Sequence, residues 1–293
     1  MSGTIRPLRS VLYMPGSNAR ALDKAKSIPA DALILDLEDA VAPDAKDLAR
    51  TQVCAAARSG EYGHRQIAIR VNGLDTPWGE ADLVAAAAAG PDAILVPKIS
   101  SGDMIRDLAE RMARAGAPER TALWAMMETP SGMLRAAEIA SAHPRLRVLV
   151  MGTNDLAKEL HAAHVPGREP LLTGLGLCLL AARASGLVAI DGVYNDIKDE
   201  EGFAAECAQG VRLGFDGKTL IHPSQVAPCN AAWAPDASEI EHARRVIAAF
   251  EEAAAQGKGV ATVDGRMIEN LHVENARRAL ALAEALAARG GSV

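Results

Sequence analysis

Polar side chains follow several short apolar runs in this 293-residue chain, and two of them are carboxylates suited to a metal. Glu128 directly follows the run 122–127, and Asp155 follows the run 148–152. A hard cation such as Mg²⁺ prefers oxygen ligands and commonly uses one or two protein carboxylates, which leaves positions for water and substrate oxygens. We therefore predict that Glu128 and Asp155 hold Mg²⁺. From spacing alone, surface or salt-bridged carboxylates remain the alternative.

Other apolar runs also end in residues that could bind or act on a small anionic ligand. They are Asp36, Glu38, Asp39, Arg70, Asn72, Lys98, Asn154, Asp191, Asn195 and His222. Several carboxylates at one site would repel one another unless cations neutralise them. This pattern favours both a metal and a functional role for Arg70.

Two other patterns that could bind a metal are weaker. His161 and His164 could share a helix face, but no nearby His or Cys completes a set of zinc ligands. The cysteines are scattered without a Cys-x-x-Cys pair, at positions 54, 178, 207 and 229. We expect buried reduced thiols, with no disulfide framework and no zinc site.

An alternation of strands and helices must position these residues. The predicted strands are 10–15, 32–36, 66–71, 93–97, 122–127, 148–152, 188–191 and 217–221. Each is followed by a helical pattern, and this βαβα rhythm indicates a parallel sheet. The count matches an α/β protein with a (β/α)8 TIM barrel, whereas a doubly wound sheet usually has about five or six strands. Barrel enzymes place their chemistry at the C-terminal ends of the strands.

The regular alternation ends near Pro228. Beyond it, the pattern predicts a long helix over 238–256, a short extended piece over 257–264 and a second helix over 271–289. We therefore expect a barrel domain over 1–230. A C-terminal helical extension over 231–293 would either pack as a helix pair or act as a lid.

Composition and charge narrow the class of partner. The chain is 49% hydrophobic and 23% charged, which is typical of a globular protein. Its net charge of -6 disfavours binding to nucleic acid or anionic membranes. The segment Met1 to Arg9 lacks an apolar signal-peptide core, and no stretch approaches the roughly 20 apolar residues of a membrane span. We expect a cytoplasmic protein whose partners are small molecules.

Several ordered motifs together point to a known family. They are SVLYMPGS at 10–17, DLEDAV at 36–41, RVNGLDTP at 70–77, VPK at 96–98, METPSG at 127–132, GTNDL at 152–156, FDGKTLIHPSQ at 215–225 and VDGRMI at 263–268. With these motifs the chain resembles the citrate lyase beta subunit and malyl-CoA lyase family of the HpcH/HpaI aldolase superfamily. The resemblance covers nearly the whole chain.

The resemblance implies a TIM barrel assembled as a homotrimer or hexamer, with Mg²⁺ on Glu128 and Asp155 and a CoA thioester as substrate. Arg70 would stabilise enolate charge, and Glu38 would orient it. A buried structural Arg-Glu pair is the alternative. Asp264 would be the acid-base group, carried by a C-terminal segment that reaches over a neighbouring subunit's site. By itself, Asp264-Gly265 predicts an exposed turn.

The family's CoA-binding positions also map onto this sequence. They fall on Tyr13, Lys24, Asn154 with Asp155, and Ile221 with His222. Asn18 stands where malyl-CoA lyases tend to carry an arginine, which puts one phosphate contact in doubt. Arg20 is a nearby cation that could replace it.

The expected activity is therefore that of a Mg²⁺-dependent carbon-carbon lyase. It would cleave or form a 3-hydroxyacyl-CoA such as malyl-, citramalyl- or citryl-CoA, with acetyl-CoA and a 2-oxo acid as the other side of the reaction. Three alternatives stay open: a pyruvate-type aldolase that uses no CoA, a malyl-CoA thioesterase, and a citrate lyase-type subunit that needs an acyl-carrier partner.

Overall fold

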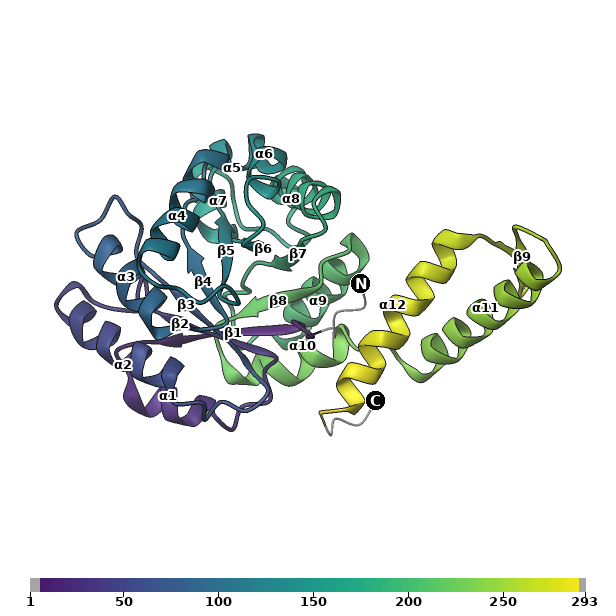
Figure 1. The fold of residues 1–293 in the computed structure, drawn as a ribbon, viewed down its shortest axis with the longest axis horizontal. Helices are drawn as coiled ribbons and strands as arrows, with labels where there is room; N and C mark the ends of the chain where they lie inside the picture. Colours follow the sequence, from purple (N-terminus) through teal and green to yellow (C-terminus); the bar gives the residue numbers. More distant parts are fainter. Residues whose placement is uncertain (1–5, 290–293) are drawn as a thin grey trace. The chain divides into compact units, whose positions relative to one another are not determined.

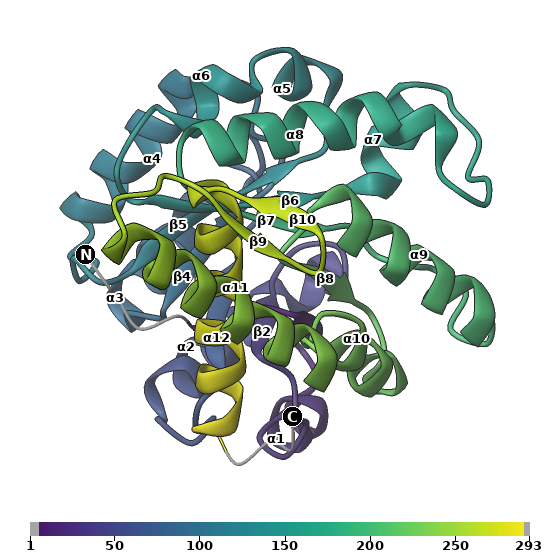
Figure 2. The ribbon, with the colours of Figure 1, turned by 90° about the vertical axis from the view of Figure 1, so that its right-hand side faces the viewer.

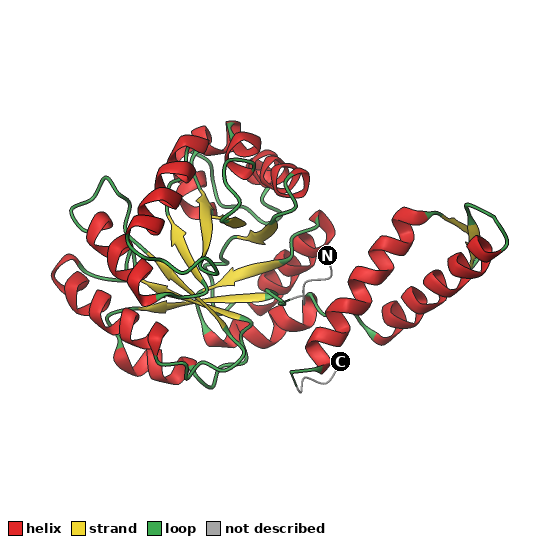
Figure 3. Cartoon of the chain, viewed as in Figure 1, coloured by secondary structure: helices red, strands yellow, loops and turns green. Residues whose placement is uncertain are grey.

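Eight parallel strands form a closed barrel in the computed structural model, which describes residues 6–289. The strands follow one another around the barrel in sequence order, and β8 closes it by pairing with β1. Figure 3 shows the strands of the barrel in yellow, with helices in red around them. Their bounds are β1 Ser10–Pro15, β2 Ala32–Asp36, β3 Gln66–Arg70, β4 Ala93–Val96, β5 Ala122–Met127, β6 Leu146–Met151, β7 Val188–Asp191 and β8 Gly217–Leu220. The predicted TIM barrel is confirmed.

Helices surround the strands (Figure 1). They are α1 Ala19–Ala25, α2 Lys46–Arg58, α3 Gly79–Ala89, α4 Gly102–Arg114, α5 Pro130–Leu134, α6 Ala136–Ala140, α7 Thr153–Glu159, α8 Leu172–Ala184, α9 Glu200–Leu213 and α10 Val226–Ala232, with short 3₁₀ turns η1 Pro43–Ala45, η2 Glu169–Leu171 and η3 Pro223–Gln225. In α4, for example, Ile105, Leu108 and Met112 are buried at the spacing of one helix face. Within the described part of the chain, no helix has both the length and the apolarity needed to cross a membrane.

The barrel interior is packed with alternate residues of the strands. Pairs such as Ala32 and Ile34 in β2, or Trp124 and Met126 in β5, belong to one buried cluster. Residues two apart in a strand share a face, so these positions define which side chains of β1 to β7 point inward.

Four strands differ slightly from their predicted bounds. The strands β3, β4 and β8 each end one residue earlier, while β6 begins two residues earlier and ends one earlier. The early start of β6 coincides with a shift in register against β5 between Leu123 and Trp124. Hydrophobic pattern alone does not show where a strand pair changes register.

The described residues divide into two compact units: residues 8–232, which hold the barrel, and residues 6–7 with 233–289. The second unit consists of helix α11 Ala237–Ala255, the hairpin strands β9 Ala261–Val263 and β10 Arg266–Ile268, and helix α12 Asn270–Ala287. The hairpin links the two helices (Figure 2). The second unit has a small apolar core of its own, which includes Val246, Val263, Ile268 and Val273.

The sequence predicted the extended piece around β9 but missed β10. Three-residue strands are too short to show an alternation of apolar and polar residues. The turn between them, Asp264-Gly265, has φ values of 49° and 74°. Positive φ at both central residues is the geometry that Asp-Gly favours in tight hairpins.

Barrel closure gives the first testable prediction. A Cβ added at Gly217 in β8 would overlap the backbone carbonyl oxygen of Leu8 and approach that of Arg9 to 2.6 Å. Gly217→Ala should therefore disturb the pairing of β8 with β1 and lower the melting temperature by several degrees or prevent folding. Gly176→Ala in α8 is the matched control, because a Cβ there has nothing within 4 Å. Thermal denaturation of both variants checks this; equal melting temperatures would contradict it.

Candidate active site

At the C-terminal ends of three strands, the next side chain on the inward-facing side is charged. Asp36 comes two residues after Ile34, Arg70 two after Ala68, and Glu128 two after Met126, and those three apolar residues all belong to the barrel core. Because side chains two apart share a face, the core register carries these charged groups to the inside of the barrel at its C-terminal mouth. Asp36 is fully buried, and Glu128 is only 2% exposed.

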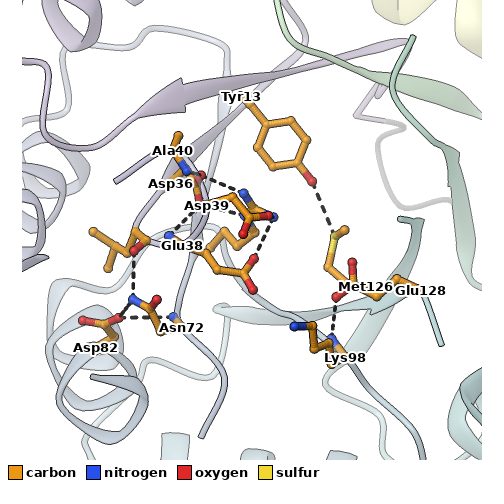
Figure 4. Close-up of polar contacts among 12 residues, drawn as sticks. Tyr13, Asp36, Glu38, Asp39, Ala40, Asn72, Asp82, Lys98, Met126 and Glu128 are labelled. Carbon is orange, nitrogen blue, oxygen red and sulfur yellow. Dashed lines mark hydrogen bonds and ion pairs between the residues drawn. The ribbon is translucent and has the colours of Figure 1, made fainter. Parts of the chain in front are cut away.

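Arg70 is held by three carboxylates, those of Asp36, Glu38 and Asp39, which are labelled in Figure 4. Its Nε and Nη2 donate to the two oxygens of Asp36 at 2.6 and 2.7 Å. Its Nη1 lies 2.7 Å from Glu38 Oε2 and 3.4 Å from Asp39 Oδ2. The guanidinium carbon also lies 4.8 Å from the ring centroid of Tyr13. Burial alone would lower the pKa of Arg70, but Asp36 and its neighbours raise it well above the usual value, so Arg70 stays charged.

The loop that carries Glu38 is fixed by buried polar contacts. Lys46 Nζ donates to the carbonyl oxygens of Leu37 and Glu38 at 2.7 and 2.8 Å, and to Asn72 Oδ1 at 2.8 Å. Asn72 in turn donates to Asp82 and to the Leu37 carbonyl. Burial raises the pKa of Glu38 to about 8, although Arg70 opposes the shift. The geometry thus joins Glu38 to Arg70, but Asp36 makes the two-point contact.

Glu128 is oriented by backbone on two sides. The Lys98 N–H donates to Glu128 Oε1 at 2.7 Å. Any Cβ at position 152 would overlap Glu128 Oε2, so only glycine leaves room for this carboxylate. Burial raises the pKa of Glu128 to about 7; the Lys98 N–H opposes this rise and the charge of Asp155 adds to it.

Asp155 completes the pair of carboxylates. It lies in the first turn of α7, directly after β6, and is partly exposed. Its charge acts on Glu128, which follows the neighbouring strand β5. Glu128 Oε2 accepts no hydrogen bond from the described residues, and the two carboxylates repel one another. An oxygen-ligated dication such as Mg²⁺ fits this arrangement, because it neutralises both carboxylates and needs few protein ligands.

Other potential metal ligands do not gather elsewhere. Among residues 6–289, no group of three or more His, Cys, Asp or Glu side chains could hold a metal ion. His161 and His164 follow the end of α7 at Glu159, so the helical spacing does not apply to them. The four cysteines are free and buried, as the sequence indicated.

The residues expected to bind CoA lie on the segments that follow β1, β6 and β8. Tyr13 is near the end of β1, and Lys24 is exposed in the last turn of α1. Asn154 and Asn195 exchange hydrogen bonds of 3.1 and 2.8 Å. Ile221 is 41% exposed. Tyr13, Asn154 and Ile221 lie at or directly after strand ends, on the side of the barrel where a ligand of this fold binds, whereas Lys24 lies at the far end of α1.

Two residues of this end have structural roles of their own. The imidazole of His222 accepts the Ser224 N–H and caps η3. Asn18 is the N-cap of α1, with its side-chain oxygen accepting the Ala21 N–H at 3.0 Å. Asparagine is among the best N-cap residues, so Asn18 has a structural role at the start of α1.

Asp191, another polar strand end, belongs to a buried ion-pair network. It is fully buried and accepts from Arg168 Nη1 at 2.7 Å and Lys218 Nζ at 3.2 Å. Lys218 also contacts Glu206 at 2.7 Å. Buried charges are stable when paired in this way, so this network supports the barrel wall at β7 and β8.

Asp264 is described within the C-terminal unit. Its two oxygens accept from Arg245 at 2.8 and 3.0 Å, and His242 Nδ1 lies 3.4 Å from Oδ2. The side chain is half exposed in the hairpin turn, as Asp-Gly predicted. The hydrogen bond from Arg245 lowers the pKa of Asp264, which keeps it an anion.

Comparison with known proteins now decides the family. The model of the HpcH/HpaI aldolase/citrate lyase family matches residues 9–223. This chain belongs to that family. A second model, for carbon-carbon bond lyases of the TIM-barrel fold, matches residues 176–287.

Two family relatives cover nearly the whole chain. A (3S)-malyl-CoA thioesterase of Cereibacter sphaeroides is 57% identical over 98% of this chain and 99% of its own length. The citrate lyase subunit beta of Escherichia coli is 38% identical over 97% of this chain and 96% of its own.

A family structure from Mycobacterium tuberculosis shows what one member binds. The CitE protein, solved in complex with magnesium, acetoacetate and coenzyme A, has 30% identity and a TM-score of 0.78. The match covers 94% of this chain and 97% of that one. The aldolase/citrate lyase family and the TIM barrel are those that the sequence analysis predicted. Magnesium and coenzyme A are bound by this relative.

Sequence reasoning missed several residues that shape the family site in this chain. Asp36 was recognised as a polar strand end but not as the main partner of Arg70. Lys46 and Asp82 were not singled out at all, and Gly152 was expected only to permit a tight turn or close approach of a ligand. The alternation Ile34 to Asp36 carries the signal for Asp36, whereas Lys46 is on a helix and reaches the site only through its long side chain.

The pKa of Glu128 gives a pH-dependent prediction. A metal ligand must be deprotonated, and burial raises the pKa of Glu128 to about 7. Mg²⁺ affinity should therefore be full above pH 7 and fall by up to about tenfold per pH unit below it. Isothermal titration calorimetry between pH 6 and 8 measures this. An affinity that is the same at pH 6 and pH 8 would contradict the assignment.

Proposed function

We propose that this protein uses Mg²⁺ on Glu128 and Asp155 to cleave a 3-hydroxyacyl-CoA into acetyl-CoA and a 2-oxo acid, or to form it. The observation that carries the proposal is the buried Glu128 carboxylate, on which the charges of Asp155 and Arg70 both act at the barrel mouth. The magnesium and coenzyme A bound by the related CitE protein support the same assignment. Malyl-CoA is the first candidate substrate, because it is named for the 57% identical relative.

The proposed steps follow from the residues. When bound, Mg²⁺ would polarise the hydroxyl and carboxylate oxygens of the substrate. Loss of the hydroxyl proton and cleavage between C2 and C3 leave the 2-oxo acid and the enolate of acetyl-CoA. Arg70 would stabilise the enolate oxygen, because it is charged and held rigidly by Asp36 and Glu38. In the forming direction the Asp264 anion would remove a methyl proton of acetyl-CoA. In the cleaving direction the hydroxyl proton would pass to solvent, and Asp264 that has taken up a proton from solvent would deliver it to the enolate carbon.

Thioester hydrolysis is the second candidate, and the thioesterase relative favours it. In that reaction water attacks the thioester carbonyl and releases free CoA and the hydroxy acid. Arg70 could stabilise the oxyanion that forms, in the same way as it would stabilise an enolate. The aldolase without CoA and the carrier-dependent subunit use the same barrel mouth and remain alternatives.

The assembly belongs to the proposal as well. We infer a homotrimer or hexamer in which the C-terminal unit acts as a lid, so that Asp264 serves the site of a neighbouring subunit. Closure would exclude water and so favour carbon-carbon cleavage over hydrolysis. The cytoplasmic location and the CoA contacts of Tyr13, Lys24, Asn154, Ile221 and His222 stay predictions.

A substrate screen tests the proposed reaction. Malyl-, citramalyl- and citryl-CoA are incubated with enzyme and Mg²⁺, and both 2-oxo acid and free CoA are measured. Cleavage gives 2-oxo acid with acetyl-CoA, whereas hydrolysis gives free CoA without 2-oxo acid. Glu128→Ala and Asp155→Ala should each lower turnover by about a thousandfold or more, while Asp103→Asn on the exposed face of α4 should leave it unchanged. Full activity in EDTA would refute the metal-dependent mechanism.

The role of Asp264 has its own test. Asp264→Asn should slow the exchange of acetyl-CoA methyl protons by about a hundredfold or more, with little effect on binding of the 2-oxo acid. Arg245→Ala is the matched control, because it removes the same ion pair but keeps the carboxylate. NMR of deuterium exchange measures the rates. Similar rates in Asp264→Asn and the wild type would remove Asp264 from the mechanism.

A further inference from the structure

Lys98 combines two features that the proposed mechanism does not use. It has a φ of 53°, in the left-handed region that non-glycine residues rarely adopt. Its side chain is exposed, and its ammonium forms no hydrogen bond or ion pair with any residue in the described range 6–289. Strained backbone of this kind often lies at functional sites. Lys98 follows β4, beside the site.

The backbone of Lys98 serves Glu128. Val96 still pairs with Ala125 in the ladder between β4 and β5, and the Ile99 N–H returns to the Met126 carbonyl at 3.3 Å. Between these points the left-handed residue turns its own N–H out of the ladder and toward Glu128 Oε1. The strain thus coincides with a hydrogen bond to the proposed metal ligand, and Oε2 stays free of hydrogen bonds from the described chain.

The side chain of Lys98 lies among the acidic groups of the mouth. The carboxylates that attract its charge are, in order of strength, Asp155, Glu38, Glu128 and Asp39. Arg70 is already engaged by Asp36 and Glu38, and Lys46 by backbone oxygens and Asn72. An anionic substrate entering this acidic mouth needs a cation that is not yet committed. Once a dication neutralises Glu128 and Asp155, the Lys98 ammonium is available for it.

We propose that Lys98 positions Glu128 for the metal through its peptide N–H and binds the carboxylate of the 2-oxo acid through its ammonium. This inference rests on the proposed function, because it assumes Mg²⁺ on Glu128 and an anionic substrate. Removing the Lys98 ammonium should have opposite effects on Mg²⁺ and on the 2-oxo acid. Loss of the ammonium should strengthen Mg²⁺ binding, because a competing positive charge is gone, and weaken binding of the anion.

Four variants separate the two halves. Lys98→Gly and Lys98→Val both lack the ammonium, but glycine accepts a positive φ and valine does not. Lys98→Met and Lys98→Arg keep a long side chain and differ in charge. Calorimetry measures the Kd of Mg²⁺, and then the Kd of glyoxylate, the 2-oxo acid that malyl-CoA cleavage would release, at saturating Mg²⁺. Circular dichroism and melting temperature confirm the fold of each variant.

For Mg²⁺, we expect Lys98→Val to bind about tenfold more weakly than Lys98→Gly, because its N–H is turned away from a charged acceptor. Lys98→Met should bind Mg²⁺ as well as or better than the wild type, by up to about fivefold. For glyoxylate, Lys98→Met should bind about two- to fivefold more weakly than Lys98→Arg, as expected for an exposed charge pair.

Equal Mg²⁺ affinity in folded Lys98→Val and Lys98→Gly would overturn the backbone role. Equal glyoxylate affinity in Lys98→Met and Lys98→Arg would overturn the ammonium role, and this comparison holds even if Lys98→Val does not fold. If the wild type binds both Mg²⁺ and glyoxylate, either of these two results overturns only the role of Lys98 and not the proposed function. A wild type that binds no Mg²⁺ would instead refute the proposed function and this inference together.

Discussion

The buried ion pair between Arg70 and Asp36 is the interaction on which the barrel mouth depends. Asp36 is the last residue of β2, Arg70 is the last of β3, and the two residues are partners in the register of these strands. An isolated buried charge would be costly, so neither side chain could face inward without the other. The pair is formed by two parallel hydrogen bonds, the geometry in which Arg binds a carboxylate most specifically.

The remaining site groups are arranged around that pair. Tyr13 stacks on the guanidinium, Glu38 contacts its free edge, and Lys46 fixes the loop on which Glu38 lies. Glu128 is different, because no cation among residues 6–289 forms an ion pair with it: burial raises its pKa to about 7, and the hydrogen bond that it accepts comes from the Lys98 peptide N–H. A site with one carboxylate paired to Arg70 and one buried carboxylate without such a partner is suited to a dication at the second one.

The sequence allowed the barrel to be predicted almost completely, because apolar runs of four to six residues alternate with amphipathic helices. The family motifs also located the charged residues at the strand ends. What could not be predicted were contacts set by register and side-chain reach. Asp36 and Glu38 are equally acidic in the sequence and two residues apart, so alternation does not distinguish them. Asp36 binds Arg70 at two points because it is the last residue of β2 and the register partner of Arg70, whereas Glu38 lies in the loop that follows. Similarly, the left-handed backbone of Lys98 and the space at Gly152 depend on neighbouring strands.

The central claim is that a dication binds between Glu128 and Asp155, within reach of Arg70. Anomalous X-ray diffraction from crystals soaked in Mn²⁺, which takes the same oxygen ligands, tests it most directly. We expect one strong peak in each barrel, bonded to a carboxylate oxygen of Glu128 and one of Asp155 at about 2.0 to 2.3 Å. A peak that avoids Glu128, or no peak in a barrel mouth that is otherwise ordered, would rule out a dication at this pair of carboxylates.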